Sequence, residues 1–343
     1  LVAGEVVINA TVTHPAQSAT ARDPVSGQWI PDNRVWIICS NLMVTAGGEI
    51  MLDARGYQGR WGYGLPGYGP GGGAGSSGIN GGGGGHGGRG GLDLTGNGNG
   101  GPTNGVASAP ENPGSAGGCY GGTSGSGGGA LRIDAAGGAV TIDGTISADG
   151  QAVDRGGGAG GSVWITCRTI GGGGAIRANG GASTVNGGGG GGGRIAVLYD
   201  TAAQAALPLP ELSYAANGGA SLGADATFGD IGTLSFPDAR FLGETIAWPG
   251  QWVIPGLDAW SPASLTVSNV WTRFPADGFT YAVAGNVTVT GAAARLDIGG
   301  SHYDTYEGLT MSTNARPQRL YAGGDLDLAG GGKLYVYAAC TNV

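Results

Sequence analysis

Three aspartates in one short stretch come closest to a catalytic arrangement. Asp134, Asp143 and Asp149 lie within residues 131–150. Carboxylates grouped on one outer face could serve as general acid and base on a polysaccharide. Aspartates at chain corners also hydrogen-bond to their own backbone, which explains the same residues without catalysis. We therefore expect no enzyme and assign no catalytic residue, with a polysaccharide-degrading enzyme as the alternative that these carboxylates leave open.

The histidines do not have the spacing of a metal site. His14, His86 and His302 form no HExxH or similar motif. His86 lies in "GGGGGHGGRGG", which favours a solvated loop histidine. The run "GGRGGLDLTG" (87–96) approaches the calcium-binding nonapeptide, but Asp93 comes one place late. We predict no metal and no cofactor.

Four aromatic residues stand among glycines in "GYQGRWGYGLPGYGPGGG" (56–73). They are Tyr57, Trp61, Tyr63 and Tyr68. Exposed rings at this spacing could stack on the sugar rings of a glycan. The same flat rings could instead clamp glycine backbone, which has no Cβ atoms to keep them away. Both interpretations stay open here, and the second is favoured.

The elements that position these residues are repeated strand–corner–strand units. Three units align at 35–56, 131–150 and 163–180, a fourth begins at 195–200, and two later ones match at 284–300 and 323–338. Each unit holds an alternating strand, a small-residue corner and a second strand. One unit cannot bury its own apolar face, whereas stacked units can. The best helix candidate is short, at "DTAAQAAL" (200–207).

Alternation along the strands assigns their two faces. We expect an interior ladder and an outward set: inward, Val35, Ile37, Cys39, Leu131, Ile133, Ala135, Val163, Ile165, Cys167, Ile195, Val197 and Tyr199; outward, Trp36, Arg132, Trp164 and Arg168. Equivalent residues in parallel strands stack about 4.8 Å apart. This pattern predicts an all-β parallel β-helix. A β-sandwich gives no reason for same-face residues to recur in matching units.

Glycine-rich segments separate the units, at 57–129, 151–161 and 181–193. We expect them to leave the stacked units at comparable points and gather on one side. Residues 187–193 are all glycine. Such runs either stay mobile or adopt a threefold, polyproline-II-like helix that hydrogen-bonds sideways to its neighbours. The sequence leaves this choice open.

Composition narrows the classes of partner. Glycine contributes 79 of 343 residues, charged residues only 12%, and the net charge is −8. Lys333 is the only lysine, so a phosphate-binding surface is not expected and nucleic acid is excluded as a partner. Apolar runs fall short of the roughly 20 residues that span a bilayer, so membrane insertion is not expected. The absence of an initiator Met indicates a mature product or a piece of a longer chain.

The segments "TIDGTISADGQAVDRGGGAGGSVWITCRTI" (141–170) and "IRANGGASTVNGGGGGGGRIAVLYD" (176–200) carry a resemblance. They resemble the glycine-rich parallel β-helix repeat proteins of bacterial surfaces, which are adhesin-like or fibre-forming. The glycine runs look like polyglycine bundles of phage adhesin tips and some antifreeze proteins. The resemblance implies secretion to the cell surface and a structural or adhesive role. It implies no catalytic residues.

These patterns predict five segments along the chain. They are first β-helix rungs at 1–56, a glycine-rich insertion at 57–129, rungs with short glycine-rich loops at 130–200, a turn-rich joint at 201–263, and rungs ending in a half rung at 264–343. We expect a structural subunit or repeat of an extracellular fibre or surface layer. A ligand- or glycan-binding adhesin is the alternative.

The two ends of the sequence suggest how copies assemble. Joined end to start, "KLYVYAACTNV" (333–343) and "LVAGEVVINATV" (1–12) align with 34–56, as two halves of one rung. Copies would then complete each other head to tail, either as tandem repeats of one long chain or as separate subunits, and form a filament. The interface predicted from this alignment comprises Leu1, Val2, Val6, Ile8, Cys39, Leu334, Val336, Cys340 and Val343. Cys340 of one copy would stack on Cys39 of the next, whereas Cys39 and Cys167 of one chain, two rungs apart, would not bond.

Overall fold

The computed structural model describes residues 2–76, 78, 80–94, 98–223, 226–300 and 316–337. The chain divides into two compact units, Leu1–Ser235 and Phe236–Val343. The regular secondary structure of both is almost entirely β-strand, and nearly all strand pairs are parallel, as the alternating pattern predicts. Among the described residues one helix occurs, α1 (Thr201–Ala205), within the predicted stretch and capped by the Asp200 carboxylate. No described helix is long and apolar enough to cross a membrane.

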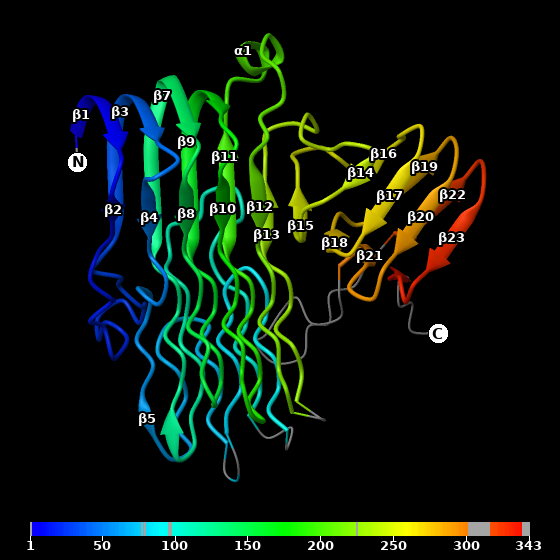
Figure 1. Cartoon of the computed structure of the whole chain (residues 1–343). Coiled ribbons are helices and arrows are strands. Elements are labelled where there is room, and N and C mark those ends of the chain that lie inside the picture. The colour runs from blue at the N-terminus through cyan, green and yellow to red at the C-terminus, as the bar shows by residue number, and fades with distance from the viewer. Residues whose placement is uncertain are drawn as a thin grey trace. The chain divides into compact units, whose positions relative to one another are not determined.

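Two parallel sheets make up the strand framework of the first unit (Figure 1). One runs in the order β1 (Val2–Ile8), β3 (Val35–Val44), β7 (Ala130–Ile142), β9 (Ser162–Gly171), β11 (Arg194–Leu198) and β13 (Thr233–Ser235). The other runs β2 (Thr11–Val12), β4 (Glu49–Met51), β8 (Thr145–Ser147), β10 (Ala175–Arg177) and β12 (Ser213–Ala215). The chain alternates between the sheets, so each strand–corner–strand unit adds one strand to both. A short antiparallel pair, β5 (Trp61–Gly62) and β6 (Gly122–Thr123), lies apart from them.

The predicted interior ladder is confirmed across the first sheet. Ile37 pairs with Ile133, which pairs with Ile165. Val197 continues the same column beside Ile165. Ile37 is 2% exposed and the other three are 0% exposed. Burying an aliphatic side chain contributes roughly 1.5–3 kcal/mol, so a column of them at successive strands fixes the register.

The small-residue corner of β7 contains a bulge. Ala135 and Ala139 are four residues apart, but their partners Cys167 and Thr169 on β9 are two apart. The extra residues of β7 fall in the Ala-Gly-Gly stretch at 136–138. Gly138 lets the strand pass close to β3, since a Cβ there would lie 1.7 Å from the Ser40 carbonyl oxygen, and the inward register resumes at Val140 and Ile170.

The second unit contains three parallel sheets. The first holds β15 (Gly250–Val253), β18 (Trp271–Phe274), β21 (Arg295–Ile298) and β24 (Lys333–Val336). The second holds β14 (Thr245–Ile246), β17 (Leu265–Ser268), β20 (Val287–Thr290) and β23 (Leu326–Ala329). The third holds β16 (Ala259–Trp260), β19 (Thr280–Val283) and β22 (Arg319–Ala322). The predicted match of 284–300 with 323–338 is confirmed, because β20 pairs with β23 and β21 with β24.

A column of left-handed residues turns the chain between two of these sheets. Asn269, Gly291 and Gly330 follow the last residues of β17, β20 and β23, with φ of 53°, 105° and 59°. Their amides continue the ladder, since Asn269 N–H donates to Thr290 and Gly291 N–H donates to Ala329. Asparagine and glycine are the residues that tolerate this backbone region most readily. The corner sequences are therefore dictated by the turn.

Candidate functional site

The glycine-rich segments of the first unit run side by side on one side of its two sheets (Figure 1). The segments 57–129, 151–161 and 181–193 gather there, as predicted. A fourth segment, 216–232, joins them, although its sequence was assigned to a turn-rich joint. Most glycines of this layer are buried. We call these four segments the glycine layer.

Backbone hydrogen bonds in the glycine layer repeat every three residues. Along residues 188–193, successive N–H groups donate in turn to three different neighbouring segments, at 2.7–3.1 Å. Gly188 and Gly191 donate to the carbonyls of Gly81 and Gly84, and Gly189 and Gly192 donate to those of Thr227 and Asp230. Gly190 and Gly193 donate to the carbonyls of Gly181 and Ala178. Residues 156–161 follow the same rule toward 115–118, 188–191 and 148–151. A β-strand would present its groups to two sides alternately. Here the groups point to three sides.

The segments approach too closely for any side chain between them. A Cβ on Gly83 would lie 1.9 Å from the carbonyl oxygen of Gly189. A Cβ on Gly189 would lie 2.0 Å from the oxygen of Gly219. These are backbone atoms, which cannot rotate away as a side chain can. The close approach therefore requires glycine at these positions.

A buried polar network links the glycine layer to the first sheet. His86 Nε2 lies 2.8 Å from Ser162 Oγ on β9, and His86 Nδ1 lies 3.1 Å from Asn104 Oδ1. Arg194 on β11 donates to the carbonyl oxygens of Asn104 at 2.9 Å and His86 at 3.4 Å. Ser162 in turn donates to the Asn112 carbonyl at 2.6 Å. Both ring nitrogens of His86 thus have partners.

The expectation of a solvated His86 is wrong. His86 is 0% exposed, and burial, assisted by the nearby Arg194 charge, lowers its pKa to about 3. Burial also lowers the pKa of Arg194 to about 10. Flanking glycines gave no indication of burial, because the layer that covers His86 comes from segments distant in sequence. The neutral imidazole, with each ring nitrogen within hydrogen-bond distance of an oxygen, acts here as a structural link between the glycine layer and β9.

The predicted aromatic group divides into two clusters. Tyr57 is 0% exposed and lies 5.3 Å from Trp29, which also lies 6.2 Å from Tyr68. Trp61 and Tyr63 are instead 64% and 63% exposed, with ring centroids 5.6 Å apart. The first cluster lies against glycine backbone, since a Cβ on Gly69 would be 2.6 Å from the Tyr57 ring. The second leaves its rings open to solvent.

The three aspartates of residues 131–150 serve separate roles. Asp134 accepts from Trp36 Nε1 at 2.8 Å and pairs with Arg132 at 3.0 Å on the outer face of the first sheet. Asp143 accepts from the Gly173 amide at 3.2 Å at a corner. Asp149 belongs to a ladder of side-chain oxygens, each of which accepts a hydrogen bond from a backbone N–H of the next unit. The Asp53 oxygen accepts from Asp149 N–H, the Asp149 oxygen from Asn179 N–H, and the Asn179 oxygen from Asn217 N–H. Asp143 and Asp149 thus bond to backbone amides, but to those of the next unit and not to their own as the corner interpretation expected.

Burial raises the pKa of Asp149, and the neighbouring Asp53 charge acts in the same direction. Arg177 opposes both, with its Nε 2.8 Å from the Asp149 carboxylate. Asn179 and Asn217 fill the equivalent positions without charge. The ladder thus needs an acceptor oxygen and not a carboxylate. Among the described residues no cluster of His, Cys, Asp or Glu could hold a metal ion.

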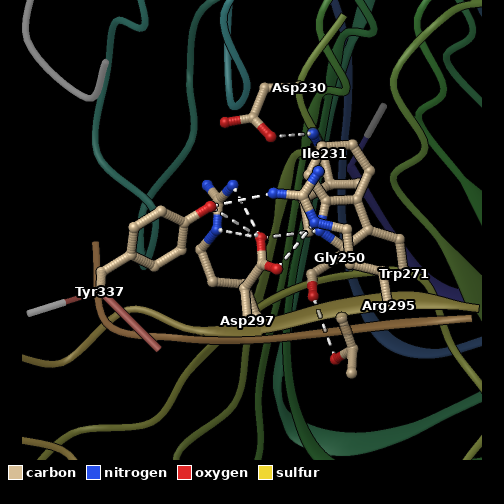
Figure 2. Close-up of polar contacts among 9 residues, drawn as sticks. Asp230, Ile231, Gly250, Trp271, Arg295, Asp297 and Tyr337 are labelled. Carbon is tan, nitrogen blue, oxygen red and sulfur yellow. Dashed lines mark hydrogen bonds and ion pairs between the residues drawn. The ribbon is translucent and has the colours of Figure 1, made fainter. Parts of the chain in front are cut away.

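A Trp–Arg–Asp arrangement recurs on the strands of both units. In the second unit, Asp297 is 0% exposed and accepts from Arg295 at 2.7 Å, Trp271 at 3.0 Å and Tyr337 at 3.4 Å, as Figure 2 shows. The Arg295 guanidinium lies 4.2 Å from the Trp271 ring and 4.3 Å from the Tyr335 ring. In the first unit, Arg132 lies 4.7 Å from Trp36 and 4.2 Å from Trp164. Both pairings join three successive strands.

Hydrogen-bond donors surround the Asp297 carboxylate. Arg273 adds a further contact to Asp297 at 3.2 Å. A carboxylate offers about four acceptor sites, which these donors take up. Hydrogen bonding to Asp297 raises the pKa of Arg295 despite its burial. The sequence signal is an Arg-x-Asp strand opposite a Trp, and it becomes recognisable only once the two strands are paired.

The predicted alignment of the chain ends is wrong. It placed Leu1 and Val2 opposite Met43 and Val44, whereas the structure pairs Val2 with Ile38 and Ala3 with Cys39. The alignment matched glycine corners, but the inward Val6 and Ile8, 8% and 5% exposed, decide the register opposite Leu42 and Val44. Ala3 of the same chain thus occupies the place that was assigned to Cys340 of another copy.

The other predicted interface residues differ in exposure. Val2 and Val336 are 77% and 44% exposed, and Leu334 is partly buried. Leu1, Cys340, Val343 and His302 lie outside the described residues. Strand β7 separates Cys39 on β3 from Cys167 on β9, as predicted, and both thiols are free. Burial raises the pKa of Cys167 to about 12.

Comparison with known proteins gives no assignment. No protein-family model, curated protein or solved structure matches the chain. Function must therefore be inferred from three features of the structure, which are the stacked parallel strands, the glycine layer and the exposed apolar residues.

Proposed function

We propose that this chain is a structural building block of an extracellular fibre or surface layer. Its parallel sheets are taken as the faces of a β-solenoid, since successive strands repeat in register and bury equivalent residues. We also propose that the chain is related to the glycine-rich β-helix proteins of bacterial surfaces and that it is secreted. No catalytic step is assigned.

The glycine layer is, in this proposal, a bundle of polyglycine-II-like helices. Hydrogen bonds with a period of three and backbone contacts closer than a Cβ allows support it. Such a helix has three residues per turn and no internal hydrogen bonds, so its amides are available to neighbours on every side. The bundle stiffens the solenoid, because each segment is bonded to several others.

The observation that carries the proposal is an uncovered apolar layer in the second unit. Leu326 and Leu328 on β23 are each 49% exposed. Their partners one strand inward, Val287 and Val289 on β20, are each 0% exposed. Val336 on β24 is likewise 44% exposed beside the fully buried Ile298. These side chains stand where a further parallel layer would bury them.

The first unit has a complementary opening beside β1. A hollow of about 380 Å³ is lined by residues 6–12 and 34–37, including the inward-facing Val6, Ile8 and Ile37. Within the described residues no strand pairs with the outer edge of β1. A second copy of the chain can bury its β23 and β24 side chains here and continue the strand ladder. This contact is heterologous, and the proposal takes it as one that does not close on itself and so generates filaments.

Light scattering of the purified chain tests this function. We expect the mass to rise with protein concentration, and Leu328→Asp to abolish the rise, because a carboxylate would be buried unpaired at each contact. Val25→Asp is the matched control, since Val25 is 93% exposed on a loop and makes no part of either surface. A wild-type chain that stays monomeric at every concentration, or a Leu328→Asp chain that assembles normally, would refute the proposal.

A further inference from the structure

We propose that Trp61, Tyr63 and Tyr120 form a binding site for a neutral glycan. The site lies on the β5–β6 pair, at the end of the glycine layer away from the two sheets of the first unit (Figure 1). The proposal goes beyond the scaffold function and does not depend on self-assembly. It rests on ring exposure, on a rigid support and on the polar groups beside the rings.

The three rings lie in one row. Trp61 lies on β5 and Tyr63 in the bend directly after it. Their ring centroids are 5.6 Å apart, and Tyr63 is 5.3 Å from Tyr120, with interplanar angles of 78° and 88°. This edge-to-face order is a favourable geometry for aromatic pairs, so the rings hold one another in place.

The backbone beneath the rings is held from both sides. Leu65 and Cys119 exchange two hydrogen bonds at 3.2 and 3.0 Å, and Gly121 N–H donates to the Gly62 carbonyl at 2.8 Å. Arg155 comes from another segment of the layer and donates to the Tyr120 and Gly121 carbonyls at 2.8 and 3.1 Å. The rings therefore stand on a preorganised support, which lowers the entropy lost on binding.

The exposure of this cluster is not explained by clamping of glycine backbone. In the same segment, Tyr57 is fully buried against Trp29 and glycine. Trp61 and Tyr63 are instead nearly two-thirds exposed. The chain thus buries Tyr57 and presents Trp61 and Tyr63, although all three stand among glycines.

The chemistry of the patch favours a glycan over other ligands. One face of a pyranose ring carries C–H bonds, which interact with the electron-rich face of an aromatic ring. Its hydroxyls project sideways, where the Asp154 carboxylate, 54% exposed, can accept hydrogen bonds. A neutral glycan needs nothing more than stacking faces and a few polar groups.

Area and charge argue against two other partners. Three partly exposed aromatic side chains present a few hundred Å², while a stable protein interface buries about 800 Å² on each side. Nucleic-acid bases also stack on aromatic rings, but their binding requires a positive groove for the phosphates. Here Arg155 is committed to backbone carbonyls and to Asp154, so the patch offers no such groove.

Retention of the full chain on insoluble cellulose and chitin, and in gels containing soluble xylan or mannan, tests the site. We expect retention by at least one of the four polysaccharides. Trp61→Ala/Tyr63→Ala should weaken the apparent affinity at least tenfold without moving the thermal transition, because both rings are exposed. Tyr63→Phe keeps the stacking face and should retain binding. Trp36→Ala removes a comparably exposed ring on β3, 43% exposed, and is the matched control.

Three results would overturn the proposal. One is the absence of retention by all four polysaccharides. Another is equal retention of the wild type and the double variant, or equal loss in the Trp36→Ala control. The third is ring-dependent binding of poly(U) RNA in place of every polysaccharide. If the double variant fails to fold, Trp61→Ala alone, measured by retention and by quenching of tryptophan fluorescence, decides between the same outcomes.

Discussion

Gly190 and Gly158 meet so closely that a Cβ on Gly190 would lie 1.9 Å from the Gly158 carbonyl oxygen. Gly190 sits in the all-glycine run of the layer, and its N–H is bonded to Gly181 at 2.9 Å. Gly190→Ala must therefore push two backbones apart and disturb their hydrogen bonds. We expect it to destabilise the first unit by about 3 kcal/mol or more, in line with the cost of overpacking a tight interior.

Gly137→Ala is the matched control for that substitution. A Cβ on Gly137 would meet nothing within 4 Å, and its φ is not in the left-handed region. Alanine there should be neutral or stabilising by about 0.4–1 kcal/mol, through lower entropy of the unfolded chain. Chemical denaturation of both variants compares them directly. Similar stabilities for the two would show that the glycine layer is not packed as described.

Ile165→Asp tests the assignment of inward and outward faces. Ile165 is 0% exposed in the column that joins β7, β9 and β11, so an unpaired carboxylate there should cost several kcal/mol. Trp164→Ser, on the opposite face, loses chiefly its contact with Arg132 at 4.2 Å and should cost less. The midpoint of thermal unfolding should be much lower for Ile165→Asp than for Trp164→Ser, and the reverse order would contradict the assignment.

Asp149 offers a test of the side-chain ladder. Asp149→Asn keeps the oxygen that accepts from the Asn179 amide at 2.7 Å and removes the repulsion from Asp53, but it loses the charge pair with Arg177. We expect a stability change within about 1 kcal/mol at neutral pH, because surface ion pairs contribute little. Asp149→Ala should cost about 1–3 kcal/mol, since the amide loses its partner. Equal effects of Asn and Ala would argue against the ladder.

His86 should make the fold sensitive to acid. Its folded pKa of about 3 lies below the ordinary value of 6.5, so between these values the unfolded chain takes up a proton that the folded chain refuses. Stability is therefore present above pH 6.5 and lost as the pH falls, by roughly 1.4 kcal/mol per pH unit from this group. His14, whose pKa burial also lowers, adds to the same trend.

The pH effect of His86 is isolated by substitution. Denaturation of the wild type and His86→Gln at pH 7.5, 5.5 and 4.5 separates this histidine from carboxylates that also titrate. His86→Gln removes the titrating group, so its stability should fall less steeply between pH 6.5 and 4.5. Parallel pH profiles for the two proteins would mean that His86 is not held neutral by burial.

The sequence predicts those parts of the fold that depend on local alternation. The column from Ile37 to Val197 follows from strand periodicity, and the Asp200 cap marks the helix. The burial of His86 and the recruitment of 216–232 arise from contacts between distant segments, which no local pattern encodes. The β1 register was missed because corner glycines were aligned in place of inward residues. Tyr57 is buried and Trp61 is exposed, and this difference likewise depends on which distant segments pack beside each ring.

Electron microscopy of the concentrated wild-type protein is the most direct test of the central claim, that copies stack end to end through their uncovered strand layers. The exposed Leu326 and Leu328, beside the fully buried Val287 and Val289, predict unbranched filaments of uniform width that lengthen with concentration. Leu328→Asp should leave only single particles. Closed rings, compact oligomers or solitary particles in the wild type at every concentration would contradict the account.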